Sequence, residues 1–257
     1  MPDSHASKSP KSINPQSSVR RRSFWGWGWE DAALGEAQRS NLAAAAAARM
    51  GISSESGLPE ALPIPRIEQL DLGKPRIEPP GSLQSLFTSD AYERAAHTYG
   101  KSFKDVLRGL LLDYSAAPDL VAFPRKESVA EDISSILEWC SENRIAVIPY
   151  GGGSSVVGGV EPVVGESYRG VVSLDLRNVA GVEDIDTTSL GASILAGSLG
   201  PRIEDDLRPH GLTLRHFPQS FEFSSLGGWI ATRSGGHYAT LYTHIDDFVE
   251  ALVLQTP

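Results

Sequence analysis

The sequence predicts an α+β fold in which two α/β subdomains follow a partly helical N-terminal arm. Between residues 120 and 176, short apolar runs flank one amphipathic stretch, which is the pattern of a strand–helix–strand unit. From residue 181 onward, strand-like runs and helical stretches alternate again, which predicts a second subdomain. We therefore divide the 257 residues into a tail at 1–22, an arm at 23–117 and a domain at 118–257.

The composition is that of a globular protein with a sizeable core. Hydrophobic residues make up 40% of the chain and charged residues 21%. The formal net charge of −9 disfavours a nucleic-acid partner, because phosphate backbones are bound by basic surfaces. No apolar run reaches the length of a transmembrane helix. The single cysteine, Cys140, excludes an intramolecular disulfide and fits a reducing compartment.

Residues 1–22 are rich in Ser, Lys, Arg and Pro, which predicts a disordered tail. The RRSF string at 21–24 is superficially similar to a twin-arginine export signal. Glu30 and Asp31 interrupt the apolar region that such a signal requires, so we reject export. We expect a cytoplasmic protein, with an organelle transit peptide as the alternative for a basic, Ser-rich leader.

The arm contains three recognisable patterns. An alanine run at 43–48 predicts a short helix, either packed or a low-complexity insert. Six prolines between residues 59 and 80 predict an extended path. Residues 90–113 predict one helix, because apolar residues between Phe103 and Leu111 recur at helical spacing.

Three short apolar runs of the domain predict strands: 120–123, 145–148 and 171–176. Between the first two, Ser128 and Glu131 form the pattern of a capping box that begins a helix. The apolar stripe of this helix includes Cys140, and Asn143 is its expected end. In the second half we expect strands at 181–185, 193–196, 212–214 and 248–254, and helices at 199–208 and 225–232.

The stretch PYGGGSSVVGG at 149–159 follows directly on the predicted strand 145–148. Consecutive glycines leave backbone N–H groups free to converge on one ligand, and such nests bind anions such as pyrophosphate. The loop has neither the G-x-G-x-x-G pattern of NAD sites nor the lysine of a P-loop. From the residues alone, a phosphate cradle and a tight structural turn both remain open.

The segment VIPYGGGSSV resembles the diphosphate loop of vanillyl-alcohol-oxidase-type, or PCMH-type, FAD-binding domains. Further matching segments follow in order: WGWGW at 25–29, PDLV at 118–121, SFEFSSLGGW at 220–229, TRSG at 232–235 and IDD at 245–247. Together they are similar to the alkyldihydroxyacetonephosphate synthases and their bacterial FAD-linked oxidase relatives. The resemblance implies a PCMH-type FAD-binding domain of two α/β subdomains.

The resemblance also implies the residues that bind the cofactor. The glycine loop would wrap the FAD diphosphate, the segment after residue 219 would line the flavin and ribityl chain, and residues 232–234 would lie beside the ring or the diphosphate. These residues are Pro149, Tyr150, Gly151, Gly152, Gly153, Ser154, Ser155, Val156, Ser220, Ser224, Ser225, Gly227, Gly228, Thr232, Arg233 and Ser234. For Arg233, a surface or interdomain ion pair is the alternative.

The sequence departs from the family pattern at two places. Gln219 stands where the synthases carry an aspartate, which removes a charged acceptor. Ser154 stands where some covalent flavoproteins carry the flavin-linked histidine of their RSGGH loop, and the RSGGH string of this chain lies elsewhere, at 233–237. We therefore expect FAD to be bound without a covalent bond.

The remaining polar residues predict no further site. His210, His216, His237 and His244 lack metal-ligand spacing, so we expect no metal. Cys140 lies on the apolar stripe of its helix and is expected to be inert.

The resemblance implies a flavoenzyme, with three interpretations of its chemistry. The first is a synthase that exchanges acyl for alkyl on dihydroxyacetone phosphate, as in ether-lipid formation. The second is an oxidase or dehydrogenase of 2-hydroxy acids or alcohols, and the third is an inactive, truncated remnant that binds FAD. The family's small-molecule substrate binds through a downstream cap domain that this sequence lacks. We therefore expect an incomplete active site, with the catalytic residues unknown, and a homodimer for a full-length protein.

Overall fold

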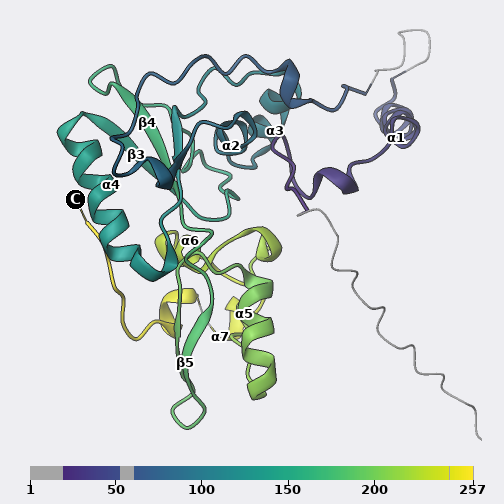
Figure 1. The fold of residues 1–257 in the computed structure, drawn as a ribbon. Coiled ribbons are helices and arrows are strands. Elements are labelled where there is room, and N and C mark those ends of the chain that lie inside the picture. The colour runs from purple at the N-terminus through teal and green to yellow at the C-terminus, as the bar shows by residue number, and fades with distance from the viewer. Residues whose placement is uncertain (1–19, 53–60, 243, 257) are drawn as a thin grey trace, which may run out of the picture.

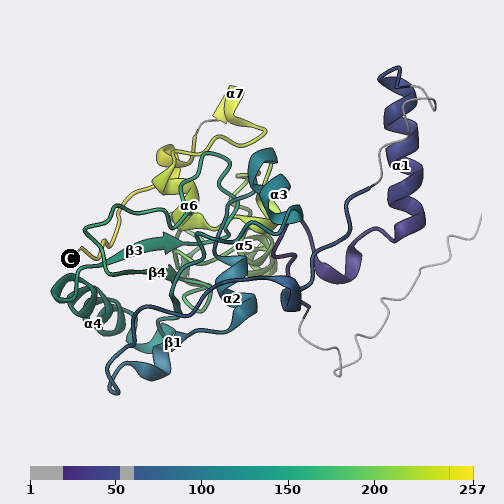
Figure 2. The same ribbon diagram turned by 90° about the horizontal axis from the view of Figure 1, so that it is seen from above.

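The computed structural model describes residues 20–52, 61–242 and 244–256, so most of the predicted tail lies outside the described residues. These residues form an α+β body from which helix α1 (Glu36–Arg49) stands apart on the arm, as Figure 1 and Figure 2 both show. Helix α1 contains the alanine run, so the predicted helix is confirmed. None of the helices in the described part of the chain combines the length and the apolar character needed to cross a membrane.

A four-stranded mixed sheet forms the centre of the first subdomain. Its order is β1 (Phe87–Thr88), β2 (Leu120–Ala122), β4 (Gly170–Asp175) and β3 (Ile145–Tyr150). Strands β2, β4 and β3 are parallel, and β1 pairs antiparallel with β2. Tyr150 is in register with Asp175, so β3 and β4 end together at one edge of the sheet. The predicted strand–helix–strand unit is confirmed, with β4 inserted between its two strands.

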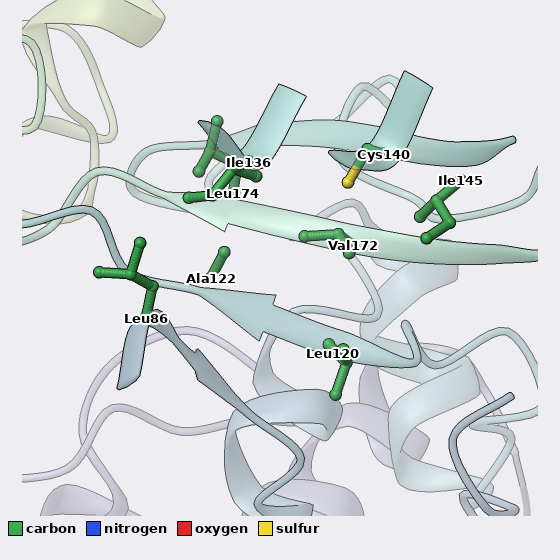
Figure 3. Close-up of a cluster of buried hydrophobic side chains, with 8 residues drawn as sticks. All are labelled: Leu86, Leu120, Ala122, Ile136, Cys140, Ile145, Val172 and Leu174. Carbon is green, nitrogen blue, oxygen red and sulfur yellow. The ribbon is translucent and has the colours of Figure 1, made fainter. Parts of the chain in front are cut away.

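The core of this subdomain lies between the sheet and helix α4 (Val129–Glu142). Ile136 and Cys140 of α4 contact Val172 and Leu174 of β4, among the buried side chains drawn in Figure 3. Burial raises the pKa of the Cys140 thiol to about 12, which confirms that this cysteine is inert at neutral pH.

The start of α4 differs from the predicted capping box. Ser128 ends the short 3₁₀ turn η5 (Lys126–Ser128) and makes no capping hydrogen bond with its side chain. In the first turn of α4, the carboxylate of Asp132 accepts hydrogen bonds from the backbone N–H and the guanidinium of Arg125. Arg125 lowers the pKa of Asp132 to about 2. The capping-box prediction is wrong because a local ion pair ties down this turn in its place.

The predicted helix at 90–113 is two helices, α2 (Ala91–Ala96) and α3 (Phe103–Leu110). Asp90 caps α2, and Ser102 caps α3 in a capping box with Asp105. Ser102 therefore begins a new helix inside the predicted one, because its hydroxyl accepts the hydrogen bond of a free first-turn amide. Helix α3 leaves much of its apolar face in solvent, with Phe103 85% exposed.

Residues 20–52, which are called the arm from here on, are anchored to the body through an aromatic core. Phe24 and Tyr114 are buried against Tyr92 and Ala95 of α2 and against Tyr99. Within the described residues 61–86, the proline-rich stretch follows an extended path interrupted by two short 3₁₀ turns, η3 (Ile67–Gln69) and η4 (Gln84–Leu86), which agrees with the prediction; Pro59 lies outside the described residues. The arm therefore packs on the face of the molecule that carries α2 (Figure 2).

The second subdomain consists of the hairpin β5–β6 and short helices. Its elements are β5 (Val182–Asp186), β6 (Gly191–Ile194), α5 (Gly200–Leu207), η6 (Arg208–His210), η7 (Phe221–Phe223), α6 (Leu226–Ala231), α7 (Ala239–Tyr242) and η8 (Ile245–Phe248). Ile203, Leu226, Trp229 and Ile245 form its core. The paired strands and both predicted helices are confirmed.

The strands predicted at 212–214 and 248–254 are wrong. Residues 212–214 are irregular, and residues 249–256 run beside α4 as an extended segment without strand pairing (Figure 1). Val253 and Leu254 are exposed, and Gln255 donates a hydrogen bond to Ser134 of α4. A β-prone sequence becomes a strand only where another backbone supplies its hydrogen bonds, and the described residues place none beside these two segments.

Candidate functional site

The glycine loop leaves the sheet at the shared carboxyl edge of β3 and β4, where parallel α/β sheets bind their ligands. A Cβ atom on Gly151 would clash with the Ser225 side chain, and one on Gly152 would clash with the Phe223 carbonyl. Gly153 has a φ of +68°, which favours glycine. The glycine loop is therefore closely packed, as the structural-turn alternative requires.

Close packing does not remove the hydrogen-bonding capacity of the loop. Within the described residues, the amides of Gly151, Gly152 and Gly153 donate no hydrogen bond. The Gly152 carbonyl accepts a hydrogen bond of 3.0 Å from Arg22. Because the C=O and N–H of a trans peptide point in opposite directions, the Gly153 amide points away from Arg22. Gly151 and Gly152, but not Gly153, line the ligand space described next.

A cavity of about 460 Å³ lies in front of this edge. Its walls come from the sheet edge, the arm and the second subdomain. They include Arg20, Arg21, Arg22, Trp27, Trp29, Tyr92, Glu93, Lys101, Tyr150, Gly151, Gly152, Asp175, Arg177, Gly197, Leu199, Arg202 and Phe223. The cavity at the carboxyl edge is thus closed on one side by residues 20–29, which precede the glycine loop by more than 100 residues in the sequence.

Three cations of the cavity have no carboxylate within ion-pair distance in the described part of the chain: the exposed Arg21, which lies over the Tyr92 ring, and the partly buried Arg22 and Lys101. Burial lowers the pKa of Arg22. Burial, with a smaller contribution from Arg22, lowers the pKa of Lys101 to about 8. The Lys101 ammonium reaches only the Phe24 carbonyl, at 3.5 Å. The cavity therefore holds positive charge that the protein does not neutralise.

The acidic residues of the cavity are already paired. Arg177 donates to Asp175 and to both carboxylate oxygens of Glu93. The buried His97 contacts the same Asp175 carboxylate at 2.8 Å. Burial acts to raise the pKa of Asp175, but His97 and Arg177 hold it below its usual value. This network links α2 to the end of β4 and leaves no acidic group to repel an anion.

The serine- and glycine-rich segment predicted to line the flavin packs directly behind the glycine loop. Ser224 accepts a hydrogen bond from the Trp229 indole at 2.6 Å and donates to the Ser220 carbonyl. A side chain on Gly227 would press against Ala196. Ser224 and Ser225 are buried, and Phe223 is the residue of this segment that lines the cavity. The structure therefore brings this segment to the back of the loop.

The predicted residues 232–234 do not line the cavity. Thr232 is exposed and donates to the Gly228 carbonyl. Arg233 is 72% exposed and forms an ion pair with Asp246 at 2.8 Å, which is the surface-pair alternative. Ser234 contacts the ring of the buried His216 at 3.1 Å. Among the other predicted residues, Pro149, Gly153, Ser154, Ser155, Val156 and Gly228 also lie outside the cavity walls.

Sequence reasoning missed four residues of the site: Arg22, Lys101, Asp175 and Arg177. Asp175 lies near the end of the predicted strand 171–176 and Arg177 follows it, as the glycine loop follows 145–148, so their position at a strand end is a usable indication. Arg22 and Lys101 carry no such indication, because only the fold returns the arm to this edge.

The geometry agrees with the comparison with known proteins. Residues 118–257 match the family model described as FAD binding domain. The chain is 35% identical to the alkyldihydroxyacetonephosphate synthase of Dictyostelium discoideum over 202 residues, and 37% identical to that of Trypanosoma brucei brucei over 171 residues. It is 30% identical over 175 residues to the glycolate oxidase subunit GlcD of Bacillus subtilis.

A solved structure of an alkyldihydroxyacetonephosphate synthase superimposes with a TM-score of 0.64 at 33% identity. The match covers 71% of this chain and 35% of that one. The alignments cover 76% and 65% of this chain against 32% and 27% of the two synthases, and 65% against 36% of the glycolate oxidase subunit. The chain spans about a third of the length of these relatives.

The residues present fit the dinucleotide that this family binds. A diphosphate needs donors and positive charge, and the cavity offers unbonded glycine amides with Arg22 and Lys101, whereas its carboxylates are neutralised by Arg177 and His97. A loop without side chains allows a phosphate to approach its backbone closely. With its α+β architecture and its match over residues 118–257, the chain belongs to the family of FAD-binding domains, in the PCMH-type fold, and its cofactor is FAD.

Proposed function

We propose that this chain is the FAD-binding portion of a flavoenzyme of the alkyldihydroxyacetonephosphate synthase type, which exchanges acyl for alkyl on dihydroxyacetone phosphate. The observation that carries the proposal is the extent of the likeness. The alignment with the Dictyostelium synthase covers 76% of this chain at 35% identity, whereas the alignment with the glycolate oxidase subunit covers 65% at 30% identity. The WGWGW string at 25–29 supports the same choice.

When bound, FAD supplies the ring on which the chemistry takes place. The residues of this chain bind and orient the cofactor. Gly151 and Gly152 present backbone amides, and the buried Ser224 and Ser225 keep the loop in place from behind. The catalytic residues remain unassigned, and we propose that the small-molecule substrate is bound through a cap outside this sequence.

An oxidase or dehydrogenase of 2-hydroxy acids is the second candidate. It is favoured by the likeness to the glycolate oxidase subunit of Bacillus subtilis and to a D-lactate dehydrogenase of Arabidopsis thaliana, at 30% and 29% identity. An FAD-binding chain without activity of its own is the third candidate. For the whole protein we further propose a cytoplasmic location, non-covalent binding of FAD at a loop that carries Ser154, and a homodimer.

The test begins with the purified chain and added FAD. A flavin spectrum that stays with the protein on gel filtration, and is released by acid precipitation, supports non-covalent binding. Because we place the substrate site in a cap outside this sequence, activity is then measured on the protein that carries the cap, with an acyl-dihydroxyacetone phosphate and a long-chain alcohol, and separately with glycolate or D-lactate and an electron-accepting dye. Ether formation supports the first candidate and dye reduction the second. Bound FAD with neither activity supports the third, and failure to bind FAD contradicts all three.

A further inference from the structure

The matched FAD-binding segment begins at residue 118, but much of the cavity wall comes from before it. Arg22, Trp27 and Trp29 belong to the arm, and Lys101 begins the turn before α3. The arm is held there by several contacts: the Tyr92 hydroxyl donates to the Arg22 carbonyl at 2.8 Å, and the Trp27 indole donates to the Lys101 carbonyl at 3.0 Å. The arm is therefore a fixed wall of the site.

The arm also contacts a residue of the second subdomain that lines the site, Phe223. The rings of Trp27 and Trp29 lie about 6 Å from that of Phe223, and the Arg22 guanidinium lies 5.3 Å from the same ring. Arg22 further donates to the Gly152 carbonyl. One arginine of the arm thus contacts both the glycine loop and the residue behind it.

The charges of the cavity identify which cations are available to a ligand. Arg20 pairs with Asp31, Arg202 with Asp206, and Arg177 with Asp175 and Glu93. Arg21 lies over the Tyr92 ring at 4.3 Å. Across the described ranges, Arg21, Arg22 and Lys101 have no carboxylate within 4 Å, and of these Arg22 and Lys101 are partly buried whereas Arg21 is exposed. Two partly buried positive charges without counterions favour the binding of a doubly charged anion.

We propose that Arg22 and Lys101 form a clamp for the diphosphate of the cofactor, so that the dinucleotide site of this chain extends beyond the family domain and is closed by the arm. This inference rests on the proposed binding of FAD. A guanidinium offers several donors in one plane, and an ammonium offers a point charge, which together suit two adjacent phosphoryl groups. Arg22 and Lys101 line the same cavity as Gly151 and Gly152, whose amides donate no hydrogen bond within the described residues.

The test compares ligands with and without phosphate on matched variants of the full chain. FAD, ADP and riboflavin are titrated by calorimetry against the native chain, Arg22→Gln and Lys101→Met. Arg208→Gln is the control, because this exposed arginine pairs with Asp205 and lies outside the cavity. Circular dichroism and thermal unfolding verify that each variant folds. If Arg22→Gln does not fold, Lys101→Met alone still tests the clamp.

The proposal expects each clamp variant to weaken FAD and ADP binding by about 10- to 100-fold, the usual effect of losing a charge-assisted hydrogen bond. Riboflavin, which has no phosphate, should bind all variants equally. Folded clamp variants that bind FAD and ADP like the native chain overturn the clamp while leaving FAD binding intact. A native chain that binds ADP but not FAD, with ADP weakened by both variants, supports the clamp and contradicts the proposed flavoenzyme. A native chain that binds neither ligand overturns both.

Discussion

Gly152 shows at the scale of one residue why the loop needs glycine. A Cβ atom there would overlap the Phe223 carbonyl, so the loop could not lie against the 223–225 segment. Its own carbonyl accepts a hydrogen bond from Arg22, which fixes the orientation of the peptide. A single missing side chain thus sets both the packing of the loop and the direction of its donors.

We predict that Gly152→Ala destabilises the chain by about 1–3 kcal/mol, because backbone atoms cannot move aside as a flexible side chain can. FAD affinity should fall at least tenfold, since the loop amides shift with the backbone. Urea unfolding and flavin titration measure the two effects. Gly165→Ala is the matched control, because nothing lies within 4 Å of its added Cβ atom. Equal stability and affinity in both variants would show that the loop is not tightly packed.

Lys101 gives a pH-dependent prediction. Its pKa is about 8 in the folded chain and near 10.4 when unfolded, so the unfolded state binds more protons between these values. The free energy of unfolding should therefore rise with pH from about 8 to 10. Relative to Lys101→Met, the native chain should gain about 1–2 kcal/mol over this window in urea unfolding series. Lys104→Met, at an exposed position, should show the same dependence of the unfolding free energy on pH as the native chain. If Lys101→Met also showed the native dependence, the prediction would be contradicted.

At the scale of elements, the junction of α2 with β4 positions the carboxyl edge. The buried His97 and Asp175 form a network there with the half-exposed Arg177, which also pairs with Glu93. Tyr150 at the end of β3 packs on the His97 ring at 4.1 Å and donates to the Ala96 carbonyl. The ends of both strands are therefore tied to the same short helix, which keeps the loop at a fixed place above the cavity.

Asp175→Asn should reduce the free energy of unfolding at pH 7 by about 1–3 kcal/mol, because it removes the charge of a buried carboxylate that is bonded to His97 and to the half-exposed Arg177. The native pKa of Asp175 is lowered, so its contribution is present above the unfolded value near 3.9 and is lost as the pH falls through the folded value. The difference between the two chains should accordingly vanish in acid. Asp184→Asn, at an exposed position of β5, serves as the control. If the native chain and Asp175→Asn still differed by the same free energy of unfolding at pH 2, the stabilising role of the ionised Asp175 would be contradicted.

Some helices and strands could be predicted from sequence patterns alone, and others could not. The core strands were predictable because β2 and β4 are buried along their whole length and form nearly continuous apolar runs, and α4 was predictable because its apolar stripe matches one buried face. The split between α2 and α3 was missed, since the apolar spacing through Phe103 and Leu107 reflects a helix face that stays exposed rather than a continuous core contact. The strands at 212–214 and 248–254 depended on partners that local sequence does not specify.

At the scale of the whole molecule, the site is assembled by the return of the arm to the body. The glycine loop was predictable from its position after a strand, whereas Arg22 and Lys101 were not, because their role depends on contacts with residues far along the chain. Arg233 illustrates the opposite case: its string matched the family, yet its side chain lies outside the cavity in an ion pair with Asp246.

Phe24 is expected to anchor the arm, since it is buried between Tyr92 and Tyr114. Phe24→Ala should release the arm at a cost of about 3–5 kcal/mol. Limited digestion with trypsin should then cut after residues 20–22 at least tenfold faster than in the native chain, with the sites identified by mass spectrometry. Leu34→Ala, at an exposed position of the arm, should leave the rate unchanged. Equal rates for the native chain and Phe24→Ala would show that the aromatic core does not hold the arm.

The buried thiol of Cys140 has a practical consequence. It is the single cysteine of the chain, and its pKa of about 12 leaves almost no thiolate at neutral pH. A maleimide dye would therefore attach to a cysteine engineered on the arm without labelling the native position. Movement of the arm during cofactor binding can thus be followed by fluorescence in a chain whose own cysteine is left in place.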